Sequence, residues 1–215
     1  MTEAKAAGRP YHHGDLRRTL LAAAAEAIDE SGPSALSLRD LARRAGVSHA
    51  APAHHFGDKA GLLTAFATEG FELLAQTLDR VREQTDSLLE LGVGYVRFAV
   101  GHRAHFEVMF RPELFHPDDP ELVAAQQRAG RALQAGVTTL PTAPEGTAAA
   151  QAGRAAWSIA HGFATLWLGG ALPSDQVGPD PEAAAREVLR MLFRLDGPTR
   201  DEPTPGGSDR TRDPA

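Results

Sequence analysis

A stretch of twenty residues, 37–56, constrains the fold more than any other part of the chain. Ser37 and Asp40 match the S-x-x-D capping box, which predicts that a helix begins at Ser37. Gly46 can adopt the left-handed conformation that ends a helix, and Ser48 can cap a second helix. The stretch therefore predicts two short helices joined by a glycine-containing turn, which is a helix-turn-helix unit.

The second of these helices is expected to expose small residues and histidines, namely His49, Ala50, Ala51, Ala53 and His54. Histidine can donate to or accept from base edges in the major groove, and alanine methyls can contact thymine methyls. We therefore expect this surface to read double-stranded DNA. A short surface helix without a partner is the alternative interpretation. Pro52 disfavours helical geometry at the residue before it, which predicts a short or slightly irregular helix.

Other residues of this region are candidates for contacts with the DNA phosphates, namely Ser37, Arg39, Ser48, His55 and Lys59. Lys59 stands at a predicted helix start, where a cation is unfavourable unless an anion lies nearby. For His55, packing against Phe56 is an equal alternative. Residues 9–13 can form an arm on the flanking backbone or a solvated, mobile end.

Helical periodicity extends over most of the 215 residues, and no segment alternates as a strand would. The sequence predicts an all-α fold of about nine helices, at 14–31, beginning at 37 and 48, and at 58–84, 86–104, 105–110, 121–139, 147–170 and 181–195. We expect three regions: a DNA-binding head with its arm (1–57), a helical effector-binding and dimerisation body (58–196), and a disordered Pro/Gly-rich tail (197–215).

Composition and motifs exclude several classes of protein. The chain has no cysteine, which rules out disulfides and thiolate metal sites and indicates a reducing, cytoplasmic location. No catalytic or nucleotide-binding signature is present, so no enzyme activity, metal or cofactor is expected. Residues 155–174 lack charge over about the length of a bilayer span. Their glycines and polar residues instead predict a buried helix at a subunit interface, with no membrane partner.

The charge is unevenly distributed. The net charge is −6, yet residues 1–60 hold eight Lys/Arg against seven Asp/Glu and five of the nine histidines. A nearly neutral, histidine-rich head on an acidic body favours a small, specific DNA contact over a broad electrostatic one.

The head resembles the TetR family of tetracycline-repressor-like transcriptional regulators. The resemblance rests on Tyr11-His12-His13-Gly14-Asp15-Leu16-Arg17, Ser37-Leu38-Arg39-Asp40-Leu41-Ala42, Ala45-Gly46-Val47-Ser48, His55-Phe56, Asp58-Lys59 and Leu62-Leu63. The family pattern commonly has tyrosine where this chain has Ala53, so an aromatic hydroxyl that often faces DNA is missing. Trp157, His161 and Gly162 resemble the Trp-x-x-x-His-Gly signature of one C-terminal group. The resemblance implies a homodimer joined by a four-helix bundle, with a small-molecule pocket in each body.

Aromatic and histidine residues of the body are candidates for that pocket: Phe98, His102, Phe106, Met109, Phe110, Trp157 and His161. His102 and Phe106 lie four residues apart and share a helix face, as do Trp157 and His161. An apolar cavity with a few polar groups suits an effector. Ordinary core packing with satisfied histidines is an equal alternative for each residue.

Taken together, these patterns predict a cytoplasmic, homodimeric repressor that a small-molecule effector releases from a near-palindromic operator. Two alternatives stay open. One is a helical ligand-binding module or enzyme with a vestigial helix-turn-helix. The other is a dimeric regulator without an effector, whose body serves only assembly.

Overall fold

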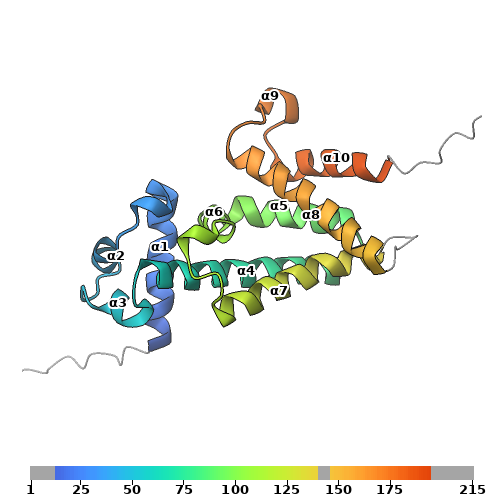
Figure 1. The fold of residues 1–215 in the computed structure, drawn as a ribbon. Helices are drawn as coiled ribbons and strands as arrows, with labels where there is room; N and C mark the ends of the chain where they lie inside the picture. The colour runs from blue at the N-terminus through green and yellow to red at the C-terminus, as the bar shows by residue number, and fades with distance from the viewer. Residues whose placement is uncertain (1–12, 140–145, 195–215) are drawn as a thin grey trace, which may run out of the picture.

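The computed structural model describes residues 13–139 and 146–194, which are helical throughout apart from turns and loops (Figure 1). All nine expected helices are present in these residues, with one addition, the short α9. The α-helices are α1 (His13–Ala35), α2 (Leu38–Arg44), α3 (Ala51–Phe56), α4 (Lys59–Gln84), α5 (Leu88–Gly101), α6 (Arg103–Met109), α7 (Pro120–Ala135), α8 (Gly146–Leu168), α9 (Ser174–Val177) and α10 (Pro181–Arg194). The predicted arm and tail lie outside the residues whose side chains are described.

The head consists of α1, α2 and α3, and Leu20, Ile28 and Leu41 of these helices are fully buried. The predicted stop at residues 31–33 is a kink: Gly32 has φ 74° and ψ 164°, and a last turn follows to Ala35. Only glycine adopts such a backbone without strain, so this position redirects the chain toward α2.

The turn between α2 and α3 confirms one prediction and corrects another. Gly46 is left-handed (φ 66°), and the N–H of Val47 donates to the carbonyl of Ala42 at 3.0 Å. Ser48, however, does not cap α3, whose N-cap is Ala50 without a side-chain bond. Because Pro52 has no N–H and suits a first helical turn, α3 begins at the residue before it. The helix is therefore short, as predicted, but starts later.

The capping box predicted at the start of α2 is also corrected. Ser37 is the N-cap and has the expected extended backbone, but its side chain makes no capping bond. The carboxylate of Asp40 pairs with two arginines instead.

Helix α4 belongs to both head and body (Figure 1). Asp58 caps it by accepting from the N–H of Gly61 at 2.8 Å. A Cβ on Gly61 would lie 2.0 Å from the carbonyl oxygen of Phe56, so glycine allows α3 to end against α4. Farther along, α4 packs against α5, α6 and α7. The domain boundary predicted after residue 57 therefore stays a prediction.

The body surrounds a core that includes Tyr95, Phe98 and Leu78. Helix α7 ends earlier than predicted, at Ala135, and a 3-10 turn, η2 (Gly136–Thr139), follows it. A Cβ on Gly136 would lie 2.2 Å from Leu91, so this turn passes close to α5. In the described part of the chain, no helix is both long and apolar enough to cross a membrane.

Two bidentate ion pairs fasten α10 to α5. Arg97 donates to Glu182 through Nε at 2.7 Å and Nη2 at 2.6 Å. Arg186 donates to Glu90 through the same two nitrogens, each at 2.9 Å. These hydrogen bonds hold the pKa of Glu182 and of Glu90 below the usual glutamate range. Helix α10 is therefore fixed against the body by charge as well as by apolar packing.

Candidate nucleic-acid interface and ligand cavity

The predicted base-reading surface is open at the outer side of the head. Ser48, His49, Ala50, Ala53 and His54 are all exposed. Ala51 is half-buried, and Pro52 turns inward and is buried. Helix α3 lies at the end of the molecule that is remote from α8 and α10 (Figure 1). The small side chains leave nothing bulky in front of the helix backbone, so another molecule can approach it closely.

The candidates for phosphate contacts divide into two groups. Ser37 and Arg39 are exposed, as is Ser48. Lys59 is half-buried, and its Nζ donates to the carbonyl oxygen of Ser34 at 2.8 Å. His55 is half-buried as well, with ring contacts to both of its neighbours in the chain. Lys59 thus ties the start of α4 to the end of α1, a partner that the sequence analysis did not foresee.

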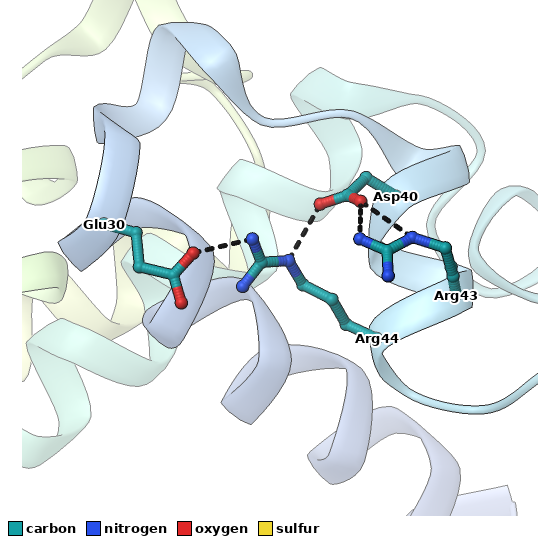
Figure 2. Close-up of polar contacts among 4 residues, drawn as sticks. All are labelled: Glu30, Asp40, Arg43 and Arg44. Atoms are coloured by element: carbon teal, nitrogen blue, oxygen red, sulfur yellow. Dashed lines mark hydrogen bonds and ion pairs between the residues drawn. The ribbon is translucent and has the colours of Figure 1, made fainter.

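A charged network fixes α2 against α1 (Figure 2). Arg44 donates to Glu30 of α1 at 2.7 Å and to Asp40 of α2 at 2.8 Å, while Arg43 donates to Asp40 at 2.5 Å. The bonds from Arg44 lower the pKa of both carboxyl groups, and Arg43 lowers that of Asp40 further. The spacing of Asp40 from the two arginines, three and four residues, was the available signal in the sequence.

A polar cavity of about 500 Å³ separates the head from the loop that precedes α7. The N–H of His116 in this loop donates to Oγ1 of Thr64 in α4 at 3.0 Å. The His116 ring lies 3.9 Å from the carboxylate of Asp58, which caps α4. The loop therefore rests on the first turns of α4, which directly follows α3 in the chain.

A second cavity, of about 540 Å³, lies within the body and is mainly apolar. Its described walls come from α4, α6, η1 (Pro112–Leu114), the following loop, α7 and α8. They are Phe71, Leu74, Met109, Phe110, Pro112, Phe115, Pro117, Gln126, Ala129, Gly130, Leu133, Gln134, Gly153, Arg154 and Trp157. The volume lies in the range of ~300–1,000 Å³ that is typical of small-molecule sites.

The seven predicted pocket residues do not all line this cavity. Met109, Phe110 and Trp157 do. Phe106 and His161 line a neighbouring cavity of about 380 Å³, which Phe110 also borders. Phe98 and His102 line a third hollow of about 330 Å³ between α4 and α5. The sequence analysis missed the wall from α7, although Leu122, Ala129 and Leu133 follow a helical apolar stripe there.

A buried tyrosine links Trp157 and His161, which lie one turn apart on α8. The hydroxyl of Tyr95 in α5 accepts from Nε1 of Trp157 at 3.2 Å and lies 2.9 Å from Nδ1 of His161. The hydroxyl donates to Nδ1 in one neutral tautomer of His161 and accepts from Nδ1–H in the other. Burial lowers the pKa of His161 and raises that of Tyr95. A tyrosine among the apolar residues 93–96 of α5 was the overlooked signal.

His102, at the start of α6, and His105, within it, contact neighbouring residues of the body. Nε2 of His105 lies 3.1 Å from a carboxylate oxygen of Glu69, and its ring stacks on Phe66 with centroids 4.0 Å apart. Burial lowers the pKa of His102, and the neighbouring His105 lowers it further. Among the described residues, no three acidic or histidine side chains come together to hold a metal ion.

Two protein families match the chain. Residues 20–66 match the family described as bacterial regulatory proteins, tetR family, and residues 88–192 match the tetracyclin repressor-like C-terminal domain. These two segments correspond to the head with the start of α4, and to the body from α5 to α10.

A curated relative is the HTH-type transcriptional regulator BetI from Ectopseudomonas mendocina, which is 37% identical over 70 residues. That alignment covers 33% of this chain, which spans only 36% of the relative's length.

Solved structures extend the likeness to the body. A protein of unknown function from Rhodococcus sp. RHA1 is 35% identical, with 87% of this chain and 98% of that chain covered and a TM-score of 0.72. The regulator FadR from Bacillus subtilis, solved in complex with stearoyl-CoA, is 18% identical over 81% of this chain and 96% of that one, with a TM-score of 0.63. At that identity, the second likeness shows the fold alone. With both of its regions matched, the chain belongs to the TetR family of transcriptional regulators.

Proposed function

We propose that the protein is a cytoplasmic, homodimeric repressor that binds a near-palindromic DNA operator and is released by a small-molecule effector. The observation that carries the DNA-binding part is the open surface of α3 and the turn before it. Exposed His49 and His54 flank small residues there, within a helix-turn-helix whose first helix is ion-paired to α1. Imidazoles supply donors and acceptors to base edges, and the small neighbours allow close approach.

The proposed dimer uses the end of the body opposite the head. Leu166 of α8 is 48% exposed, and Val188 and Met191 of α10 are 38% and 66% exposed. Gly162 of α8 has open space where a Cβ would be, so a partner helix can lie against it. A second copy covering this apolar face would give a two-fold symmetric dimer with two heads. The symmetry of such a dimer matches that of a near-palindromic site.

The proposed effector site is the 540 Å³ cavity beside Trp157. Its presence favours a ligand-responsive regulator over one whose body serves only assembly, because a filled core would leave no such space. FadR, of the same fold, was solved with a bound small molecule, which is consistent with this assignment.

The loop before α7 connects the two proposed sites. Phe115 and Pro117 line the apolar cavity, whereas His116 between them contacts Thr64 and Asp58 at the start of α4. An effector that binds better to one arrangement of this loop would shift the heads toward that state and release DNA.

Selection of bound duplexes from a random pool tests the DNA-binding function. We expect the purified protein to enrich a near-palindromic motif. His49→Ala and His54→Ala should each relax the preference at one or two base pairs. Gln127→Ala, at an exposed position of α7, is the control and should leave the preference unchanged. Failure to retain any duplex at low ionic strength would contradict the proposed function. An unaltered motif in both histidine variants would contradict the base-reading role alone.

The phosphate role proposed for Lys59 competes with its observed bond to Ser34. If Lys59 also contacts phosphate, Lys59→Ala should weaken binding to all sequences and lower the salt slope by about 1. Arg39→Ala, at an exposed position, provides the matched comparison. An unchanged slope together with lower thermal stability would assign Lys59 to the intramolecular bond alone.

A further inference from the structure

The described wall of the 540 Å³ cavity contains a single ionisable residue, Arg154 of α8. Its side chain is exposed at the cavity mouth, and no described carboxylate forms an ion pair with it. The described lining contains no acidic residue. Glu72, which follows Phe71 in α4, is paired with Arg128 of α7. The positive charge of Arg154 is therefore unbalanced by the described residues around it.

The other polar groups of the wall are mostly committed to the protein itself. Nε2 of Gln134 donates to the carbonyl oxygen of Ala149 at 3.0 Å, and Nε1 of Trp157 donates to Tyr95. Gly153 lets α8 approach the Gln134 side chain, because a Cβ there would lie 2.2 Å from its amide oxygen. Besides Arg154, the amide of Gln126 and the amide oxygen of Gln134 stay available to a ligand in the described lining.

We infer that this cavity binds an apolar monoanion, specifically a carboxylate with an alkyl or aromatic body. This inference rests on the proposed effector site and names the class of its ligand. The body of the ligand lies among Phe71, Phe110 and Leu133, and its carboxylate meets the guanidinium of Arg154 at the mouth. A planar guanidinium can donate two parallel bonds to a carboxylate. The apolar walls give no compensation to a second charge placed deeper inside.

Matched ligands that differ only in the head group provide the test. Octanoate, decanoate and 4-phenylbutyrate, each below its micelle concentration, are compared with the corresponding alcohols by calorimetry on the full chain. Quenching of the fluorescence of Trp157, which lines the cavity, reports the site when Trp167, the second tryptophan of the chain, is replaced by phenylalanine. We expect at least one acid to bind about tenfold more tightly than its alcohol, as a single charge-assisted contact at a partly exposed site provides.

Arg154→Gln should lower the affinity for the acid to that for the alcohol and leave the affinity for the alcohol unchanged. The retained alcohol binding shows that the variant is folded and its cavity intact. Arg131→Gln, on an exposed position of α7 outside the cavity wall, is the matched control and should bind both ligands as the wild type does.

Three outcomes would overturn the inference: no acid binds, acid and alcohol bind equally, or Arg154→Gln keeps the preference for the acid. DNA binding measured on the same samples separates this inference from the proposed function. A protein that retains operator DNA but binds none of the acids loses only the inference. If the acid binds through Arg154 without releasing DNA, the ligand class stands and the effector role fails.

Discussion

The head and the body each depend on a polar network, but the two networks are built in opposite ways. In the head, Glu30, Arg44 and Asp40 form charged contacts at the surface (Figure 2). In the body, Tyr95 and its two partners on α8 form an uncharged network around a fully buried hydroxyl. Water can replace the partners of an exposed ion pair, whereas it cannot reach the fully buried Tyr95, although Trp157 itself is 38% exposed. The surface network therefore sets geometry at little free energy, and the buried one contributes stability.

Tyr95→Phe should produce the largest change. The substitution keeps the ring but leaves the indole N–H of Trp157 and Nδ1 of His161 without their shared partner. We expect the free energy of unfolding in urea to fall by about 1–3 kcal/mol. A double-mutant cycle with Trp157→Phe should show coupling between the two side chains. Additive effects would contradict the network.

Acidification should produce an intermediate change that originates in the body. Burial lowers the pKa of His161 and of His102 in the folded protein, so the unfolded chain takes up protons at higher pH than the folded one. The contribution of these neutral histidines is complete above the ordinary histidine pKa of about 6.5 and is lost as the pH falls below it.

The midpoint of thermal unfolding should therefore decrease from neutral pH toward the folded-state pKa values of these histidines. Titration of the imidazole protons by NMR should place both folded-state midpoints below the ordinary value. A rise in thermal stability over the same range, or midpoints above the ordinary value, would show that neither ring is held neutral by burial.

Glu30→Gln should produce the smallest change. The variant loses the charged bond between α1 and α2, but the site is open to solvent, so the loss should be well below that of Tyr95→Phe. The difference from wild type should shrink at about 1 M salt, where charges are screened over ~3 Å. Glu26→Gln, at an exposed position of the same helix, is the control. A loss equal to that of Tyr95→Phe would refute the distinction between the two networks.

The order and type of the helices could be predicted because their signals lie within short segments. Gly32 kinks α1 and Gly46 follows the end of α2 because glycine adopts a positive φ without strain, whatever its tertiary surroundings. The start of α3 was predicted too early because Ser48 was given more weight than Pro52, although both are local signals. At α3 and the turn before it, the sequence correctly predicted that His49, Ala53 and His54 face outward, but Ala51 is half-buried.

The pocket could be predicted only in part, because its walls come from residues far apart in the chain. Met109 and Trp157 were expected, whereas Phe71 and the wall from α7 were not. Arg154 is one surface arginine among many in the sequence, and only the packing of α7 against α8 gives it an apolar cavity to face.

The sequence by itself determined the family, the all-α architecture and the composition of the surface of α3, because helix periods, caps and turns depend on neighbouring residues. The tertiary structure alone decided which partners Tyr95 and Lys59 have, that Arg44 also reaches Glu30, and where the cavity lies. Those contacts join segments separated by many residues, and their geometry follows from how whole helices pack.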